Sequence, residues 1–234
     1  MIKSALKKLK KILLPPPAKF DATGERVDIL FNKKIDFETL DMFQKSHYKR
    51  YEHALEIIGP GEVCGDFACG TGYGAVMLSK KTKKVIGADI NTGVVSAIQK
   101  RYQAIKNVEF IHANLLDLTY EEIFDNIISF ETIEHFTEDN ISRLLAVYNK
   151  GLKTGGKLII STPYLQEKDE AALKLGHHLT FYINEQTIGN WLSAAGFTPV
   201  NFWYQNYDSH LIKAELDKKD FIICEAQKCK KIAP

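Results

Sequence analysis

The sequence predicts an α/β fold in which a doubly wound, mostly parallel sheet is covered by helices on both faces. Two observations predict it. Short apolar runs alternate with longer amphipathic segments between residues 63 and 161, and such alternation requires right-handed crossovers between parallel strands. The run at 124–130 is rich in Ile and Phe, which is typical of a strand that is buried on both faces. The 234 residues are enough for one such domain with a sizeable core.

Each expected element follows from its local pattern. Apolar runs predict strands at 63–67, 84–89, 108–112, 124–130 and 157–161. Helical spacing of apolar residues predicts helices at 72–80, 92–104, 141–152 and 185–195, and a longer helical segment from 37 to 58 that Gly59-Pro60-Gly61 ends. Two further runs, at 198–204 and 219–224, are joined by a connection too short for a large crossover helix. We therefore expect the last pair of strands to be antiparallel.

A glycine-rich turn follows the first strand and precedes a helix. Gly70 and Gly72 allow the backbone to turn sharply and to approach a ligand closely, and the helix start presents unpaired N–H groups to it. The second strand ends at Asp89, where a carboxylate accepts hydrogen bonds from ribose hydroxyls in nucleotide-binding units. Together the two strand ends predict an adenosine site.

The glycine spacing alone does not identify the cofactor. Gly70, Gly72 and Ala75 also satisfy a loose form of the dinucleotide fingerprint. Asp66 discriminates better, because an acid four residues before Gly70 would place negative charge where a pyrophosphate should lie. A zwitterionic amino-acid tail beside a sulfonium tolerates that charge. Asp66 therefore favours S-adenosylmethionine over NAD.

Five segments then occur in a familiar order and spacing from about Tyr48 to the C-terminus: residues 66–74, 87–90, 110–114, 130–135 and 155–163. In these segments the chain resembles the class I S-adenosylmethionine-dependent methyltransferases. The resemblance implies a Rossmann-like, seven-stranded sheet with an antiparallel last strand, and an enzyme that uses S-adenosylmethionine. It assigns residues 18–234 to the methyltransferase domain, with a lid or acceptor insertion at 163–183.

The resemblance also implies the cofactor contacts. The backbone at Gly70 and Gly72 would face the methionine moiety and Asp89 the ribose. The remaining expected cofactor-binding residues are Asp66, Ile90 on one adenine face, Asn114 and Leu115 at the adenine edge, Phe130, and Arg50, which resembles an arginine that pairs with the cofactor carboxylate. Asn114 departs from the family pattern, which more often has an acid there; an amide can still bond an adenine edge. Asn114 as a simple turn residue and Arg50 as an exposed helical residue remain the alternatives.

Methylation of a hydroxyl needs a base beside the sulfonium methyl group. Glu131 and His135 follow the fourth strand, and His178, with His177 beside it, lies in the expected lid before Phe181-Tyr182. Imidazole suits the role because it titrates near neutral pH. His178, His135 and Glu131 are the candidate catalytic residues, with a structural role for His135 as the alternative. We expect no metal, because the catechol-type carboxylate cluster is absent after the fourth strand.

Composition limits the partners and the location. The net charge of +2 gives no global signature of nucleic-acid binding. The four cysteines show no CxxC pair and no zinc spacing, so we expect them to stay reduced. The chain has no apolar run long enough for a bilayer and no signal-peptide cleavage pattern, which predicts a cytoplasmic protein. The oligomeric state stays open.

The N-terminus differs in composition from the rest. Residues 1–14 place apolar side chains at helical spacing among lysines, and Pro15-Pro16-Pro17 stops the helix. We expect a basic amphipathic leader helix over 1–17. Contact of residues 1–14 with the anionic inner membrane face or with a partner is one interpretation. A leader helix that packs on the domain or frays in solvent is the alternative.

The sequence specifies the methyl acceptor less closely than the fold or the cofactor. The segments at 24–26, 130–135 and around His178 resemble methyltransferases associated with polysaccharide biosynthesis, which implies O-methylation of a small-molecule or sugar/glycolipid acceptor. Quinone-type and polyketide-type acceptors stay open. Two other functions remain: a short-chain NAD(P)-dependent oxidoreductase, for which Tyr164 and Lys168 have the Y-x-x-x-K spacing, and a catalytically silent nucleotide-binding module.

Overall fold

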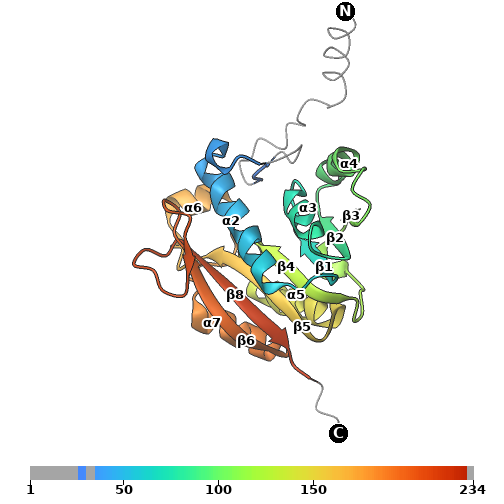
Figure 1. The fold of residues 1–234 in the computed structure, drawn as a ribbon. Coiled ribbons are helices and arrows are strands. Elements are labelled where there is room, and N and C mark those ends of the chain that lie inside the picture. The colour runs from blue at the N-terminus through green and yellow to red at the C-terminus, as the bar shows by residue number, and fades with distance from the viewer. Residues whose placement is uncertain (1–25, 30–34, 231–234) are drawn as a thin grey trace, which may run out of the picture.

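The protein, analysed as a computed structural model, is described at residues 26–29 and 35–230. One sheet of eight strands in the order β3-β2-β1-β4-β5-β8-β6-β7 runs through the described part (Figure 1). The predicted leader helix at 1–17 lies outside the described residues. The α/β fold with a mostly parallel sheet is confirmed.

The strands lie close to the predicted positions. Their bounds are Val63–Phe67 (β1), Lys84–Asp89 (β2), Val108–His112 (β3), Phe124–Phe130 (β4), Leu152–Pro163 (β5), Phe197–Gln205 (β6), Ile212–Lys213 (β7) and Phe221–Lys228 (β8). The first five pair in parallel, whereas β8 is antiparallel to both β5 and β6. The reversed last strand is therefore confirmed. The expected count of seven was one too low, because β7 has two residues and leaves no alternating pattern to detect.

The helices also follow the prediction, with shifted ends. They are η1 (Phe37–Thr39), α2 (Met42–Ile57), α3 (Tyr73–Ser79), α4 (Thr92–Arg101), η2 (Leu115–Asp117), η3 (Ile133–His135), α5 (Glu138–Gly151), α6 (Glu170–Leu175) and α7 (Glu185–Ala194). The segment expected as one helix from Phe37 is divided. The Asp41 side chain accepts from the backbone N–H of Gln44, and the Gln44 side chain accepts from that of Asp41. This capping box starts a new helix, α2.

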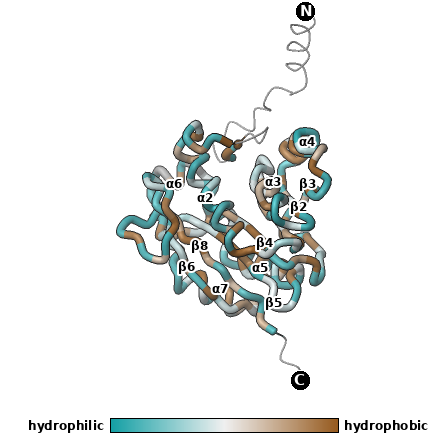
Figure 2. The backbone as a smooth tube through the Cα atoms, viewed as in Figure 1, coloured by the Kyte–Doolittle hydropathy of each residue, from teal (hydrophilic) through white to brown (hydrophobic). Residues whose placement is uncertain are grey.

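Two apolar clusters cover the faces of the sheet and make three layers. One cluster joins β4, β5 and β8 to α5 and α7, and the other joins the sheet to α2, α3 and α4. In Figure 2 the hydrophobic stretches run through the central strands, for example along β4. Ile127 and Ile128 in β4 are both fully buried, and they belong to opposite clusters. A central strand covered on both faces is what its sequence predicts.

Two further expectations concern membranes and cysteines. No helix among the described residues combines the length and apolar character needed to cross a bilayer. All four cysteines are free thiols, and only Cys229 is exposed.

Candidate active site

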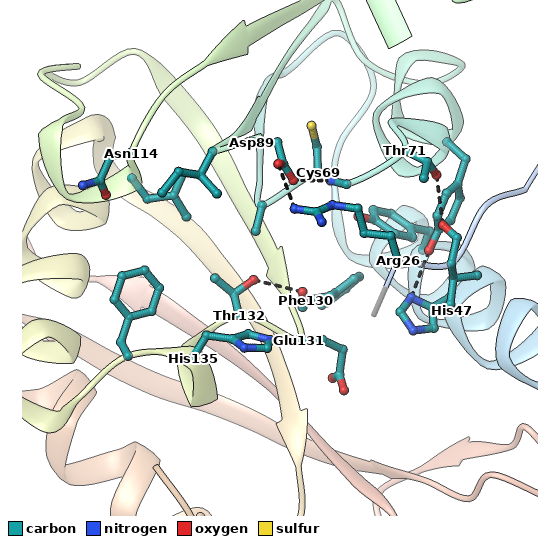
Figure 3. Close-up of a pocket in the computed structure, with 18 residues that line it drawn as sticks. Arg26, His47, Cys69, Thr71, Asp89, Asn114, Phe130, Glu131, Thr132 and His135 are labelled. Atoms are coloured by element: carbon teal, nitrogen blue, oxygen red, sulfur yellow. Dashed lines mark hydrogen bonds and ion pairs between the residues drawn. The ribbon is translucent and has the colours of Figure 1, made fainter. Parts of the chain in front are cut away.

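A cavity of about 390 Å³ opens at the carboxyl ends of β1, β2 and β4. In the sheet, β1 lies between β2 and β4, so the chain direction of the crossovers reverses at β1. Ligands of open α/β sheets bind at such a switch point. Figure 3 shows Asp89 on one side of the cavity, and Glu131 and His135 on the other. The cavity volume falls within the usual range of small-molecule sites, roughly 300–1,000 Å³.

The glycine turn forms one wall. Gly70 lines the cavity with φ +51°, and a Cβ atom built there would meet nothing within 4 Å. Gly72, also at positive φ (+76°), lies instead beneath the turn, where a Cβ atom would come within 2.8 Å of the Phe110 ring. Gly70 therefore offers backbone to a ligand, whereas Gly72 permits the loop to pack tightly on the sheet.

Asp89 ends β2 and ties the turn to the second strand. Its Oδ2 accepts from the backbone N–H of Gly70 at 3.0 Å, and its Oδ1 accepts from that of Asn91 at 2.8 Å. The Arg26 guanidinium also donates to Oδ1, at 3.2 Å. The carboxylate lines the cavity as predicted, and Arg26 reaches across to it (Figure 3). A ribose hydroxyl would have to share or displace this arginine.

The side expected to hold adenine is apolar with one amide. Ile90, Asn114 and Leu115 all line the cavity, as the sequence analysis proposed. The Ile90 side chain is 63% exposed, although it is large and hydrophobic. Asn114 is also the N-cap of η2, where its side chain accepts from the backbone N–H of Leu116 at 3.1 Å. Asn114 therefore has the turn role and also lines the cavity.

Asp66 does not line the cavity but lies beneath it. It is fully buried, and its Oδ1 accepts from the Tyr51 hydroxyl at 2.9 Å. Tyr51 is the residue that lines the cavity. Burial raises the pKa of Asp66 to about 7, although the hydrogen bond from Tyr51 opposes the rise. A cation above Tyr51 would favour the ionised carboxylate.

Arg50 is fully buried and does not line the cavity. Its guanidinium lies 3.3 Å from Oε1 of Glu131 and 4.4 Å from the centroid of the Phe221 ring. Glu131, which does line the cavity, also accepts from the Ser161 hydroxyl at 2.7 Å. Glu131 has φ +49°, an uncommon value for a residue with a Cβ atom. Arg50 and Ser161 therefore hold the carboxylate of Glu131 at the end of β4.

The two candidate histidines are neighbours, but only His135 lines the cavity. Their ring centroids lie 5.0 Å apart. Nδ1 of His135 lies 3.0 Å from the carbonyl oxygen of His177, and Nδ1 of His178 lies 2.5 Å from Oε1 of Gln166. Burial, with the nearby His135 and His177, lowers the pKa of His178 to about 4. His178 is therefore neutral near pH 7.

Several lining residues were not predicted as site residues. Phe130, which was predicted, lines the cavity as well. The lining residues that were not predicted are Arg26, Val27, His47, Tyr51, Ala68, Cys69, Thr71, Tyr73, Thr132 and Phe136. His47 and Tyr51 are four residues apart on α2, so they lie on one face of that helix. Nδ1 of His47 lies 3.0 Å from the Tyr73 hydroxyl, which ties α2 to α3. In the sequence, the i, i+4 spacing of these two polar aromatic side chains is the feature that could have indicated their place in the site.

These residues fit an S-adenosylmethionine molecule in chemical terms. The open Gly70 backbone suits the amino-acid tail, the Asp89 carboxylate suits ribose hydroxyls, and the exposed Ile90 suits an adenine face. Tyr164 and Lys168 do not line the cavity. The Tyr164 hydroxyl instead donates to Glu185, 3.3 Å away.

Comparison with known proteins agrees with this geometry. Residues 65–156 match a family described as a methyltransferase domain. A protein of Mycolicibacterium smegmatis named as a probable S-adenosylmethionine-dependent methyltransferase is 30% identical over 96 residues, which cover 41% of this chain and 35% of that protein. The demethylmenaquinone methyltransferase of Clavibacter sepedonicus is 29% identical over 168 residues, covering 60% of this chain and 67% of that protein. The chain thus spans between about a third and two thirds of the length of these two relatives.

A solved structure has the same fold. The 1,6-didemethyltoxoflavin-N1-methyltransferase of Burkholderia thailandensis, determined with 1,6-didemethyltoxoflavin and S-adenosylhomocysteine bound, superposes with a TM-score of 0.61 at 17% identity. The superposition covers 83% of this chain and 81% of that one. The sheet topology, the match of residues 65–156 and these relatives all agree with the resemblance to class I S-adenosylmethionine-dependent methyltransferases.

Proposed function

We propose that the protein transfers the methyl group of S-adenosylmethionine to a hydroxyl oxygen of a small-molecule or sugar-containing acceptor. The observation that carries this proposal is the distribution of functional groups on the two sides of the cavity. A carboxylate beside a glycine turn lies on one side, and a carboxylate with an imidazole lies on the other (Figure 3). The first side suits a nucleoside, and the second suits an acceptor that must lose a proton.

The donor side is assigned to three kinds of contact. Asp89 accepts from the ribose hydroxyls, and the Gly70 backbone faces the methionine moiety. The Ile90 side chain covers one face of the adenine ring, and Asn114 and Leu115 lie at its edge, where the Asn114 amide can form hydrogen bonds. S-adenosylmethionine, when bound, supplies a methyl group on a positively charged sulfur. Asp66, beneath Tyr51, adds negative charge below that position.

The acceptor side is assigned to Glu131 and the histidine pair. Nδ1 of His135 donates to a carbonyl oxygen, so its Nε2 is left to accept a proton from the acceptor hydroxyl. Arg50 and Ser161 hold Glu131 toward the cavity, where its charge stabilises a cationic sulfur. His178, with its lowered pKa, is a weak base, so its contribution is to position His135.

A sugar or glycolipid of polysaccharide biosynthesis is the proposed acceptor class. The support is the resemblance of residues 24–26, 130–135 and 177–182 to methyltransferases of that group, together with the lysine-rich leader at 1–14. A lipid-linked acceptor at the inner membrane face would place the leader beside anionic lipid. The Clavibacter relative, a demethylmenaquinone methyltransferase, favours a quinone-type acceptor as the second candidate.

The test separates donor binding from transfer. In a thermal melt, S-adenosylhomocysteine at a hundred times its dissociation constant stabilises a protein by about 2.7 kcal/mol. For a chain of this length that corresponds to a rise of roughly 5–10 °C in Tm. NADH should give no rise, and a rise with NADH alone would favour the oxidoreductase. Nucleotide sugars, glycolipids and quinones are then incubated with S-adenosylmethionine and analysed for a mass increase of one methylene unit.

Two outcomes would contradict the proposal in different ways. A protein that binds the donor but methylates none of the acceptor classes would be a silent nucleotide-binding module. A product in which carbon or nitrogen carries the new methyl group, shown by fragmentation, would retain the methyltransferase but exclude O-methylation.

A further inference from the structure

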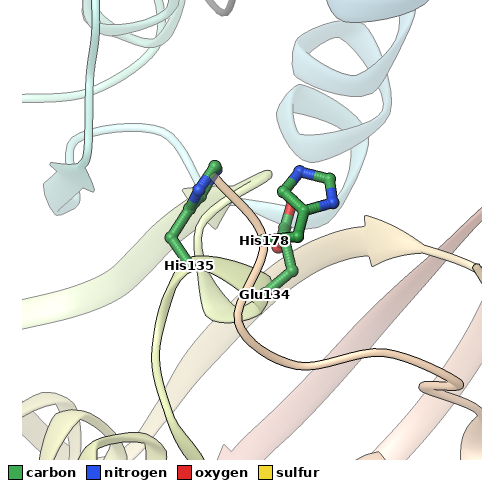
Figure 4. A group of neighbouring side chains, drawn as sticks. All are labelled: Glu134, His135 and His178. Atoms are coloured by element: carbon green, nitrogen blue, oxygen red, sulfur yellow. The ribbon is translucent and has the colours of Figure 1, made fainter. Parts of the chain in front are cut away.

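Three side chains of the kinds that bind metal ions lie together beside the acceptor side of the cavity. Glu134, His135 and His178 each offer one ligand atom, and these atoms lie within 4.8 Å of one another (Figure 4). Glu134 and His135 belong to η3, and His178 comes from the loop after α6. One carboxylate and two imidazoles form a ligand set typical of divalent transition metals.

The Glu134 carboxylate is buried with few polar neighbours. The residue is 1% exposed, and neither carboxylate oxygen forms a hydrogen bond of ordinary geometry with a described residue, although Thr162 and the Arg50 guanidinium lie nearby. Buried carboxylates are normally paired or bound to a metal, because an isolated buried charge is costly. A metal ion bound beside Glu134 would give this buried carboxylate a direct partner.

The hydrogen bonds of both imidazoles favour the tautomer that metal-binding histidines use. The carbonyl oxygen of His177 can only accept, so Nδ1 of His135 carries its proton. Oε1 of Gln166, 2.5 Å from Nδ1 of His178, imposes the same tautomer on the second ring. Each ring then has an unprotonated Nε2. Metal-binding histidines usually donate their other N–H to a carbonyl or carboxylate in this way.

The backbone holds the two halves of the cluster in place. The N–H groups of Leu179 and Thr180 both donate to the carbonyl oxygen of Glu134, at 2.8 and 3.1 Å. The Thr180 hydroxyl donates to the carbonyl oxygen of Phe136 at 2.7 Å. The loop that carries His178 is thus joined to η3 on both sides of His135. A site built this way needs little rearrangement to bind an ion.

We propose that Glu134, His135 and His178 bind one divalent transition-metal ion through a carboxylate oxygen and the two Nε2 atoms. Three protein ligands leave coordination positions open, and His135 lines the cavity, so an acceptor oxygen can complete the coordination. Two nitrogen ligands favour Zn²⁺, Co²⁺, Fe²⁺ or Mn²⁺ over Mg²⁺. This inference replaces the expectation of a metal-free site.

The inference rests on the proposed function for the role of the ion, though not for its binding. A hydroxyl bound to such an ion loses its proton more easily than a free one. With the ion in place, His135 would act as a ligand and the ion would make the acceptor hydroxyl more acidic. The proton would then pass to the Glu131 carboxylate, which lines the cavity, as the oxygen takes the methyl group and S-adenosylhomocysteine leaves. The acceptor class is then narrowed to molecules that present an oxygen ligand beside the methylated position.

Metal binding can be measured without turnover. The full-length protein is stripped with EDTA and titrated with Co²⁺, followed by calorimetry and by the visible absorption of the ion. We expect one ion per chain. Glu134→Gln and His178→Ala should each weaken binding at least tenfold, and Gln166→Leu, which removes the partner of His178, about 10–100-fold. The matched control is His177→Ala, which leaves the backbone carbonyl beside His135 in place and should bind Co²⁺ like the unaltered protein.

Each variant is also melted with S-adenosylhomocysteine, so that a folding defect is recognised. The metal site would be overturned if the unaltered protein bound neither Co²⁺ nor Zn²⁺. It would also be overturned if Glu134→Gln and His178→Ala bound Co²⁺ with the affinity of the unaltered protein. In that case, methyl transfer that continues in EDTA would support the proposed function without the metal site. Conversely, cluster-dependent Co²⁺ binding without any S-adenosylhomocysteine binding would support the metal site and refute the methyltransferase.

Discussion

The sharpest test of the donor site is a pair of substitutions with opposite expected signs. Asp89 already accepts from two backbone N–H groups and from Arg26, and we assign it two ribose hydroxyls. Hydrogen bonds to a charged group contribute roughly 1.5–3 kcal/mol each, and a neutral amide retains part of that. Asp89→Asn should therefore cost about 2–4 kcal/mol of binding free energy. That is about 30–1,000-fold weaker binding of S-adenosylhomocysteine.

Arg26→Ala should act in the other direction. The guanidinium lies 3.2 Å from Oδ1 of Asp89, and the two side chains are 19% and 6% exposed. Breaking a partly exposed ion pair costs about 1 kcal/mol, which the donor must overcome if it displaces Arg26. Removing the arginine should tighten binding by roughly fivefold.

Calorimetry with S-adenosylhomocysteine measures both effects, because this ligand does not react. Asp117→Asn is the matched control, since Asp117 is exposed, loses the same charge and does not line the cavity. Binding by Asp89→Asn within threefold of the control would refute the ribose contact. Weaker binding by Arg26→Ala would refute the competition and indicate that Arg26 contacts the donor.

Three further predictions concern stability and the leader. Because the folded pKa of Asp66, about 7, exceeds its ordinary value, the folded state binds more protons and loses stability as pH rises from about 4 to 7. Asp66→Asn should remove this pH dependence, so its free energy of unfolding, measured relative to the parent in urea melts, should rise by about 3 kcal/mol from pH 5 to pH 7.5. The same pH dependence in both proteins would disprove the raised pKa of Asp66. Gly74→Ala would place a Cβ atom 2.0 Å from Tyr51 and should lower the free energy of unfolding by about 1–3 kcal/mol. Gly189→Ala, where nothing lies within 4 Å, should instead raise it by about 0.5–1 kcal/mol, and equal effects would contradict the packing argument. Deletion of residues 1–17 should reduce sedimentation with anionic vesicles but not with neutral ones, and unchanged partitioning would remove the membrane proposal.

Residues at the ends of strands were the most predictable part of the site. Gly70, Asp89, Ile90, Phe130 and Glu131 were expected there, and all five line the cavity. The reason is topological: parallel strands bring their carboxyl ends to one edge of the sheet, wherever the strands are correctly identified.

Residues whose role depends on side-chain direction were less predictable. Asp66 and Arg50 were expected to face the cofactor, whereas the structure buries both behind residues that line the cavity, Tyr51 and Glu131. Neighbouring residues of a strand point to opposite faces, and a helix presents different residues with each small rotation. Packing against the rest of the protein settles these directions.

The cluster of Glu134, His135 and His178 likewise depends on packing that the sequence does not reveal. The sequence places Glu134 and His135 after a strand and His178 more than forty residues later. Hydrogen bonds between the two segments bring them together: Leu179 and Thr180 donate to the carbonyl of Glu134, and the Thr180 hydroxyl donates to that of Phe136. Nothing in the local pattern of either segment specifies those bonds.

The sequence by itself determined the sheet, its reversed last strand and the strand ends that line the cavity, because apolar runs and glycine turns are local signals of burial and backbone conformation. The tertiary structure alone decided which side chains reach the cavity, that Arg26 contacts Asp89, and that Glu134, His135 and His178 meet. Those contacts join segments far apart in the chain, and the packing of one layer on another sets their distances.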